Sequence, residues 1–193
     1  MSAPRGGSGG GAGRSGVGPL AIGTIVLAVI ILALTGLTRA CSFSPTEPTV
    51  DRGSVQRIDV AQVARDAARG VPFAVRAPAM PADWIPQSSD VRPVGAGQAF
   101  RLGWLTPENG YLRLVQSDAT EDALVASEQS GPPALGPVSA GGRTWTTYRG
   151  VRGEAVWVTD VDGVRWLVTG SGTPARFEQL VTTALGSPVV PRS

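Results

Sequence analysis

The segment "AFRLGWLTPENGYLRLVQS", residues 99–117, indicates the fold class more clearly than any other part of the sequence. Two runs of alternating apolar and polar residues flank "TPENG", in which the pair Asn109-Gly110 is typical of a β-hairpin turn. The alternation puts apolar side chains on one face and arginines on the other: Phe100, Leu102, Trp104, Leu112 and Leu114 against Arg101 and Arg113. The stretch therefore predicts an antiparallel hairpin with one buried face and one wet face.

Further strands are predicted on both sides of this hairpin. Runs rich in β-branched and aromatic residues, bounded by Gly and Pro, occur at 72–78, 89–95, 141–150, 154–160 and 164–170. The last two are joined through Asp162-Gly163, a second hairpin turn.

Three helices are predicted, at 59–70, 117–129 and 173–186. Each has a start signal: Asp59 with Gln62, Asp118 with Glu121, and Thr173 with Pro174. Gly70 and Gly186 end the first and third helices, and the third carries an apolar stripe of Phe177, Leu180, Val181 and Ala184.

Helix, strands, helix, hairpins and helix with short connections are typical of the α+β class. We expect one domain over residues 59–186, an antiparallel sheet of about six strands with helices packed on one face, followed by a tail at 187–193. The order of the strands does not follow from the sequence.

A membrane anchor is predicted before the domain. No charge occurs between Ser15 and Thr38, and residues 20–37 are nearly all apolar, long enough for a transmembrane helix, assigned to 19–38. The alternative is a buried core helix, but such helices are usually shorter and amphipathic. The Gly-rich tail 1–18 carries two arginines and no acid, so the positive-inside rule places it in the cytoplasm. The polar spacer 39–58 and the domain are then extracytoplasmic, and the protein is a single-pass cell-membrane protein.

Cys41 is the only cysteine, so no internal disulfide forms. It follows the apolar run in "LALTGLTRACSFSP", where a bacterial lipoprotein signal would place a leucine and then two small residues before the cysteine. Thr38, Arg39 and Ala40 stand there, and only Ala40 fits well. The run also exceeds the apolar region of a cleaved secretory signal, which favours an uncleaved anchor. Lipidation of Cys41 and a free thiol at the outer interface both stay open.

The composition excludes several kinds of chemistry. The chain has no histidine and no lysine, so all 17 basic residues are arginines. Histidine-dependent nucleophiles, the usual zinc sites, Walker loops and Schiff bases are therefore absent, and we expect no catalytic residue, metal site or cofactor. Arg101, Arg113, Arg143 and Arg149 are candidates for an anionic surface. From Ser42 onward, however, basic and acidic residues nearly cancel, so no nucleic-acid partner is expected.

Three groups of side chains are candidate sites, each with a structural alternative. The five tryptophans, above all Trp104, Trp157 and Trp166, would line a ligand cleft, although tryptophans at alternating strand positions usually pack in a core. Asp160 and Asp162 resemble the start of a calcium loop, but Asp-Gly also favours a turn. Asp118, Glu121 and Asp122 would pair as acid and base, or cap a helix.

Several segments together carry a family resemblance: "RACSFSP", "VPFAVRAPAMPADWIP", "YLRLVQSDA", "GGRTWTTYRG" and "AVWVTDVDGVRWLVTGSGT". With the apolar run, the chain from Gly36 to Gly186 resembles DUF4245, an actinobacterial family of single-pass membrane proteins defined as a domain of unknown function. The resemblance implies a location but no activity, substrate or catalytic residue. The segment "MPADW", the hairpins and the terminal helix also follow one another in the same order as in extracytoplasmic modules of lipoprotein carriers and anti-sigma regulators. This second resemblance is one of pattern alone.

Three functions follow as hypotheses. The first is a non-enzymatic extracytoplasmic module that binds a protein partner or a cell-envelope component, which predicts an exposed apolar patch. The second is a carrier or sensor of lipid or another apolar ligand, which predicts a deep cavity lined by tryptophans. Modification of Cys41 would make this carrier a lipoprotein. The third, an enzyme, needs a convergent polar cluster that the sequence does not contain, so we expect no enzymatic activity. The oligomeric state does not follow from the sequence.

Overall fold

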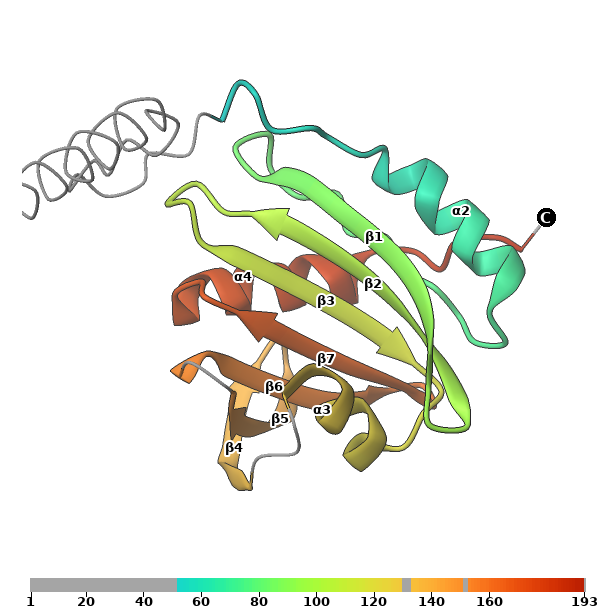
Figure 1. The fold of residues 1–193 in the computed structure, drawn as a ribbon. Helices are drawn as coiled ribbons and strands as arrows, with labels where there is room; N and C mark the ends of the chain where they lie inside the picture. The colour runs from blue at the N-terminus through green and yellow to red at the C-terminus, as the bar shows by residue number, and fades with distance from the viewer. Residues whose placement is uncertain (1–51, 130–132, 151–152, 193) are drawn as a thin grey trace, which may run out of the picture. The chain divides into compact units, whose positions relative to one another are not determined.

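The computed structural model describes residues 52–129, 133–150 and 153–192. Within these residues, three helices and seven strands succeed one another (Figure 1): α2 (Val60–Gly70), β1 (Ile85–Val94), β2 (Gly97–Leu105), β3 (Tyr111–Ser117), α3 (Glu121–Gln129), β4 (Ala134–Ala140), β5 (Arg143–Arg149), β6 (Ala155–Val161), β7 (Val164–Gly170) and α4 (Pro174–Gly186). The α+β class and the antiparallel sheet are confirmed.

The strands form one sheet in the order β1-β2-β3-β7-β6-β5-β4. Two meanders, β1 to β3 and β4 to β7, meet where β3 pairs with β7, with Leu114 opposite Val168. The sheet has seven strands where about six were expected. The run 72–78 is not a strand and contributes only an isolated bridge between Arg76 and Val189. Conversely, β4 was missed because its sequence, "ALGPVSA", contains Gly and Pro and few strand-forming residues.

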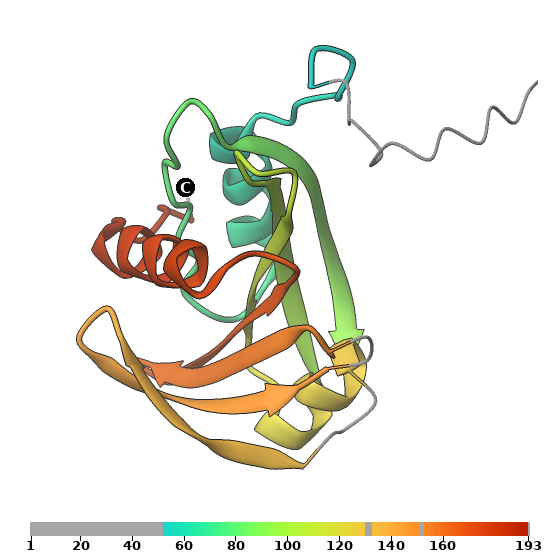
Figure 2. The same ribbon diagram turned by 90° about the vertical axis from the view of Figure 1, so that its left-hand side faces the viewer.

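Helices cover both faces of the sheet, so the prediction that they pack on one face is wrong. On one face α2 and α4 enclose the large core, whose members include Ala64, Leu102, Trp104, Trp166 and Phe177. On the opposite face α3 packs Leu124 and Val125 against Val115 and Leu167. Figure 2 shows α4 and α3 on opposite sides of the sheet. The central strands are apolar on both faces, and each face needs its own cover.

The helix starts follow the sequence only in part. The carboxylate of Asp59 caps α2 as predicted, accepting the N–H of Gln62 at 3.0 Å. Asp118 does not cap α3: its carboxylate accepts the N–H of Gln98 at 2.7 Å, across the sheet end. Thr173 precedes Pro174 at the start of α4, as predicted, and makes no side-chain cap hydrogen bond. The four residues of the predicted α4 stripe are all buried.

The predicted hairpin turns are confirmed. Asn109 adopts φ 63°, in the loop where the Thr106 N–H donates to the Gly110 carbonyl at 2.7 Å. Asp162 and Gly163 have φ 55° and 81°, as a two-residue turn between paired strands requires.

Prolines occur in both edge strands of the sheet: Pro86 and Pro93 in β1, and Pro137 in β4. The five inner strands contain none. Because proline lacks the N–H that a neighbouring strand would accept, both edges are poor templates for further strand pairing.

Ordered contacts begin before the predicted domain start at 59. Arg52 donates to the Thr106 carbonyl at 2.7 Å and to Asn109 Oδ1 at 3.1 Å, and also to the carbonyl of Asp83. The N–H of Ile58 donates to the Pro86 carbonyl at 3.1 Å. The last part of the expected spacer 39–58 therefore belongs to the fold.

No helix within residues 52–129, 133–150 and 153–192 is long and apolar enough to cross a membrane. The tail 1–18, the anchor 19–38 and Cys41 lie outside the described residues.

Candidate functional site

The three tryptophans expected to line a cleft lie in or against the core. Trp104 and Trp166 are each 1% exposed. Trp157 is 8% exposed, with its ring centroid 4.9 Å from that of Phe177 and 6.5 Å from that of Trp145. Of the three, Trp157 alone contributes to the open groove described next. The remaining Trp84 and Trp145 are also buried.

An open apolar groove of about 430 Å³ lies where β4, β5 and β6 meet the first residue of α4. We call it the edge groove and define it by Leu135, Val138, Arg149, Glu154, Trp157 and Pro174. Leu135 is 58% exposed, the most exposed large apolar side chain described. Little in the sequence indicates this groove, since Leu135 lies in a Gly- and Pro-rich segment without strand character.

A second groove, of about 410 Å³, lies between α2 and β1 and contains Val63, Phe100 and Val91, which is 43% exposed. Two carboxylates also line it, and both are engaged: Asp66 by Arg69, and Asp90 by Arg101. This groove therefore offers apolar surface but no unpaired charge.

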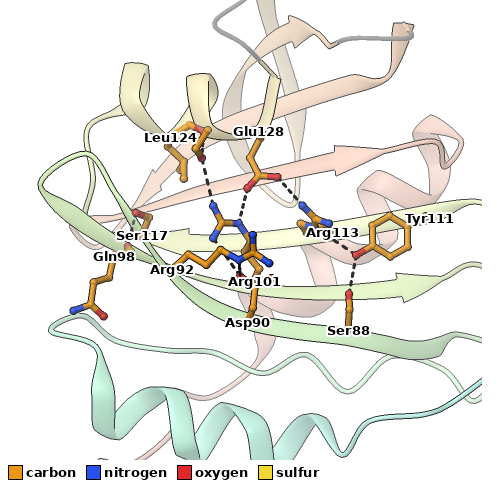
Figure 3. A network of polar contacts seen from close by, with 11 residues as sticks. Ser88, Asp90, Arg92, Gln98, Arg101, Tyr111, Arg113, Ser117, Leu124 and Glu128 are labelled. Atoms are coloured by element: carbon orange, nitrogen blue, oxygen red, sulfur yellow. Dashed lines mark hydrogen bonds and ion pairs between the residues drawn. The ribbon is translucent and has the colours of Figure 1, made fainter.

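A buried charged network lies beneath α3 (Figure 3). The carboxylate of Glu128, with a side chain 3% exposed, accepts from Arg101 Nε at 2.6 Å and from Arg113 Nη1 at 2.9 Å. Arg101 also lies 3.3 Å from Asp90 Oδ1. The face expected to be wet is therefore covered at Arg101, whose side chain is 8% exposed. Because its charges compensate one another, the network ties α3 to β2 and β3 rather than presenting a reactive group.

Tyr111 extends this network toward the end of the sheet. Its hydroxyl lies 2.8 Å from Ser88 Oγ and accepts from Arg113 Nε at 3.4 Å. Gly103 is required opposite, because a Cβ there would lie 2.0 Å from the Tyr111 hydroxyl. A polar crevice of about 180 Å³ lies beside Tyr111, Arg113 and Glu154.

The carboxylates at the start of α3 form hydrogen bonds and ion pairs with neighbouring elements. Tyr148 donates its hydroxyl hydrogen to Glu121 Oε1 at 2.6 Å, and Arg165 lies 3.7 Å from the other carboxylate oxygen. Burial and the hydrogen bond to Glu121 raise the pKa of Tyr148 to about 12. With Asp118 bound to the backbone of Gln98, this geometry favours the structural interpretation of these carboxylates over an acid–base pair.

The Asp160 and Asp162 motif is a turn. Asp160 Oδ1 accepts the N–H of Gly163 at 2.9 Å, and Asp162 occupies a turn position with positive φ. Within the part of the chain that the structure describes, no group of three His, Cys, Asp or Glu residues is placed to hold a metal ion.

The four candidate arginines do not form one surface. Arg101 and Arg113 bind Glu128, and Arg143 donates to the Asp160 carbonyl at 3.1 Å. Arg149 is exposed at the edge groove, and its guanidinium makes no hydrogen bond or ion pair with a described residue. Of the four guanidinium groups, it alone has no partner among the residues that the structure describes.

These features define a small α+β domain, helix-covered on both sides of a seven-stranded antiparallel sheet, with an open apolar groove. The chain belongs to the family described as protein of unknown function DUF4245, whose model matches residues 16–184. This match confirms the resemblance seen in the sequence, and it extends from before the apolar run at 20–37 into α4. No curated protein and no solved structure matches the chain.

Proposed function

We propose that this protein is a non-enzymatic binding module, anchored in the cell membrane by residues 20–37, whose extracytoplasmic domain binds a cell-envelope component in the edge groove. The observation that carries the proposal is Leu135, more than half exposed above a concave apolar surface that includes Trp157. Exposed apolar surface in a concave site is typical of binding sites for ligands or partners.

The polar groups of the edge groove support binding rather than catalysis. The hydroxyl of Thr147 donates to the Gly136 carbonyl at 2.8 Å, and that of Tyr148 to Glu121. The Thr147 hydroxyl contacts no basic side chain among the described residues, and the raised pKa of Tyr148 keeps its hydroxyl protonated rather than activated as a nucleophile. The groove thus offers shape and apolar surface, with Arg149 as a cation that has no ion pair with a described residue.

A crosslinker at the groove tests the proposal. The full chain, carrying a photoreactive amino acid in place of Leu135, is irradiated in the membranes of cells that express it, and the intact protein is weighed by mass spectrometry. We expect a discrete mass increment from the bound component. The matched control carries the same amino acid at Val91, an exposed apolar position in the groove between α2 and β1.

The control decides how the result is interpreted. An increment at position 135 and none at 91 supports a specific ligand in the edge groove. Equal increments at both positions, or none at either, contradict the proposal, because the edge groove would then be no different from other exposed apolar surface.

The mode of membrane attachment needs its own measurement. The intact mass of the protein extracted from its membrane should correspond to the full chain, with or without the initiator Met, if residues 20–37 remain as an anchor. A mass that begins at Cys41 and includes a lipid would contradict the anchor and establish a lipoprotein.

A further inference from the structure

We infer that the occupant of the edge groove is an acyl chain of a membrane phospholipid; this inference rests on the proposed function, which supplies the membrane. Three observations carry it: the end of the sheet at which the groove lies, the limited reach of the chain before Arg52, and the chemistry of the groove itself.

The edge groove lies at the end of the sheet where the chain enters the domain. Arg52, the first described residue, binds the Thr106 carbonyl in the loop between β2 and β3. From that loop, paired residues run across the same end of the sheet to the groove: Leu112 with Gly170, Gly170 with Ala155, and Ala155 with Arg149. The loop, the end of β7 and the start of α4 lie together at the left of Figure 1.

This entry point is held by several contacts. Arg176, in the first turn of α4, donates from Nε to Glu108 Oε2 at 3.1 Å, which joins the start of the helix to the loop that binds Arg52. The hydrogen bonds from Arg176 lower the pKa of Glu108. Arg52, the loop and the start of α4, which borders the groove, are therefore connected through side chains.

The reach of the chain limits how far this end lies from a bilayer. Residues 39–51 separate the predicted anchor from Arg52. Fully extended, a segment of this length spans at most about 45 Å, and less in any other conformation. A chain anchored by residues 20–37 therefore keeps Arg52 within this distance of the lipid headgroups.

The groove suits an acyl chain better than an extended peptide. A peptide that added a strand to β4 would need backbone partners along that edge, and Pro137 removes one donor from it. An acyl chain needs none, and Leu135, Val138 and Trp157 give it apolar contact. The guanidinium of Arg149, which has no partner among the described residues, matches a lipid phosphate, although Glu154 keeps the groove close to neutral overall. A volume of about 430 Å³ is in the range of small-molecule sites.

Tryptophan quenching tests this occupant directly. The full chain is reconstituted into vesicles of phosphatidylcholine and phosphatidylglycerol that contain phospholipid with a nitroxide on the acyl chain, which quenches tryptophan emission at short range. Trp157 is one of five tryptophans, and the other four are at most 1% exposed. We expect the nitroxide lipid to quench Trp157 most, with a smaller effect on Trp145, whose ring centroid lies 6.5 Å from that of Trp157.

Three variants assign the quenching to the groove. Trp157→Phe should remove most of it and Leu135→Asp should abolish it, while Val91→Asp, at a similarly exposed site, should leave it unchanged. Circular dichroism checks that each variant is folded. Quenching that persists in Leu135→Asp, or that is lost in Val91→Asp, would overturn the inference.

The two experiments separate failure of the inference from failure of the proposed function. A discrete crosslinked adduct at position 135 without nitroxide quenching means that the groove binds a component other than an acyl chain, and only the inference fails. Neither adduct nor quenching means that the groove is empty in the membrane, and both fail.

Discussion

The two faces of the sheet contrast in how they are buried. On the face of α2 and α4, the core is built from tryptophan, phenylalanine and aliphatic side chains. On the face of α3, a smaller apolar cluster lies beside buried charges, with Glu128 between Arg101 and Arg113. Neighbouring residues of the same strands supply both faces. Whether a face is wet is therefore decided by what packs on it, and an arginine at an alternating position does not by itself indicate solvent.

The two faces should also contribute differently to stability. Burial of apolar surface stabilises the fold in proportion to its area. A buried ion pair gains little net free energy, because the cost of removing its charges from water offsets their attraction. We therefore expect the first face to hold most of the stability and the charged network to fix where α3 docks.

The largest effect is expected on the first face. Phe177→Ala should lower the free energy of unfolding by about 3–5 kcal/mol, because it removes a fully buried ring that stacks on Trp157. Denaturant unfolding followed by tryptophan fluorescence measures this loss. Phe177→Leu, which retains most of the volume, should cost much less. Equal losses for the two variants would mean that packing around α4 is not what stabilises this face.

The second-largest effect is expected when the charged network loses its central carboxylate. Glu128→Ala should cost about 3 kcal/mol, because the buried Arg101 loses the carboxylate at 2.6 Å and keeps only the longer contact with Asp90 at 3.3 Å. The double variant Arg101→Met/Glu128→Leu should recover most of this loss, to within about 1 kcal/mol of the parent, since apolar residues of similar size replace a buried pair at little cost. A double variant no more stable than Glu128→Ala would show that the ion pair itself stabilises the second face.

The sequence predicts the central part of the fold well, because local signals there agree with the tertiary structure. Asn109-Gly110 and Asp162-Gly163 are turns, and the apolar stripe of α4 is buried as its spacing indicates. The helix at 59–70 begins at its predicted cap. In each case, the residues that form the structure and the residues that predict it lie in the same short segment.

Features that depend on distant segments were not predicted. Arg101 is buried because α3 packs over it and Glu128 lies in α3, a contact that no spacing within β2 reveals. Asp118 has capping-box spacing, yet its carboxylate accepts a hydrogen bond from the backbone N–H of Gln98 instead of capping α3. The edge groove depends on β4, which has little strand propensity, and on Pro174 at the start of α4. One signal was present and unused: prolines within strand-like runs mark edge strands.

A smaller effect compares the helix starts on the two faces. Asp59→Ala should cost about 1 kcal/mol, because its carboxylate accepts the Gln62 N–H at 3.0 Å. Thr120→Ala, at the start of α3, should cost less than half of this, since its hydroxyl lies 3.4 Å from the Ala123 N–H. Thermal unfolding of both variants checks the order. A larger loss for Thr120→Ala would mean that the start of α3 depends on its cap more than on its tertiary contacts.

The smallest effect is a titration confined to the second face. Between pH 10 and about 12 the folded protein keeps a proton on Tyr148 that the unfolded chain loses, because the pKa is raised in the fold. This contribution to stability is therefore complete below pH 10 and is lost as the pH rises through that window. No lysine titrates in the same range, since the chain contains none.

The absorbance of tyrosinate isolates this group, because the chain has only two tyrosines. In a Tyr111→Phe variant, the single remaining transition should have its midpoint near pH 12, and adding Glu121→Gln should move it toward 10. A midpoint near 10 in the folded Tyr111→Phe variant would mean that Tyr148 is neither buried against α3 nor bound to Glu121. The second face would then be more open to water than its charged network indicates, and the contrast between the faces would widen.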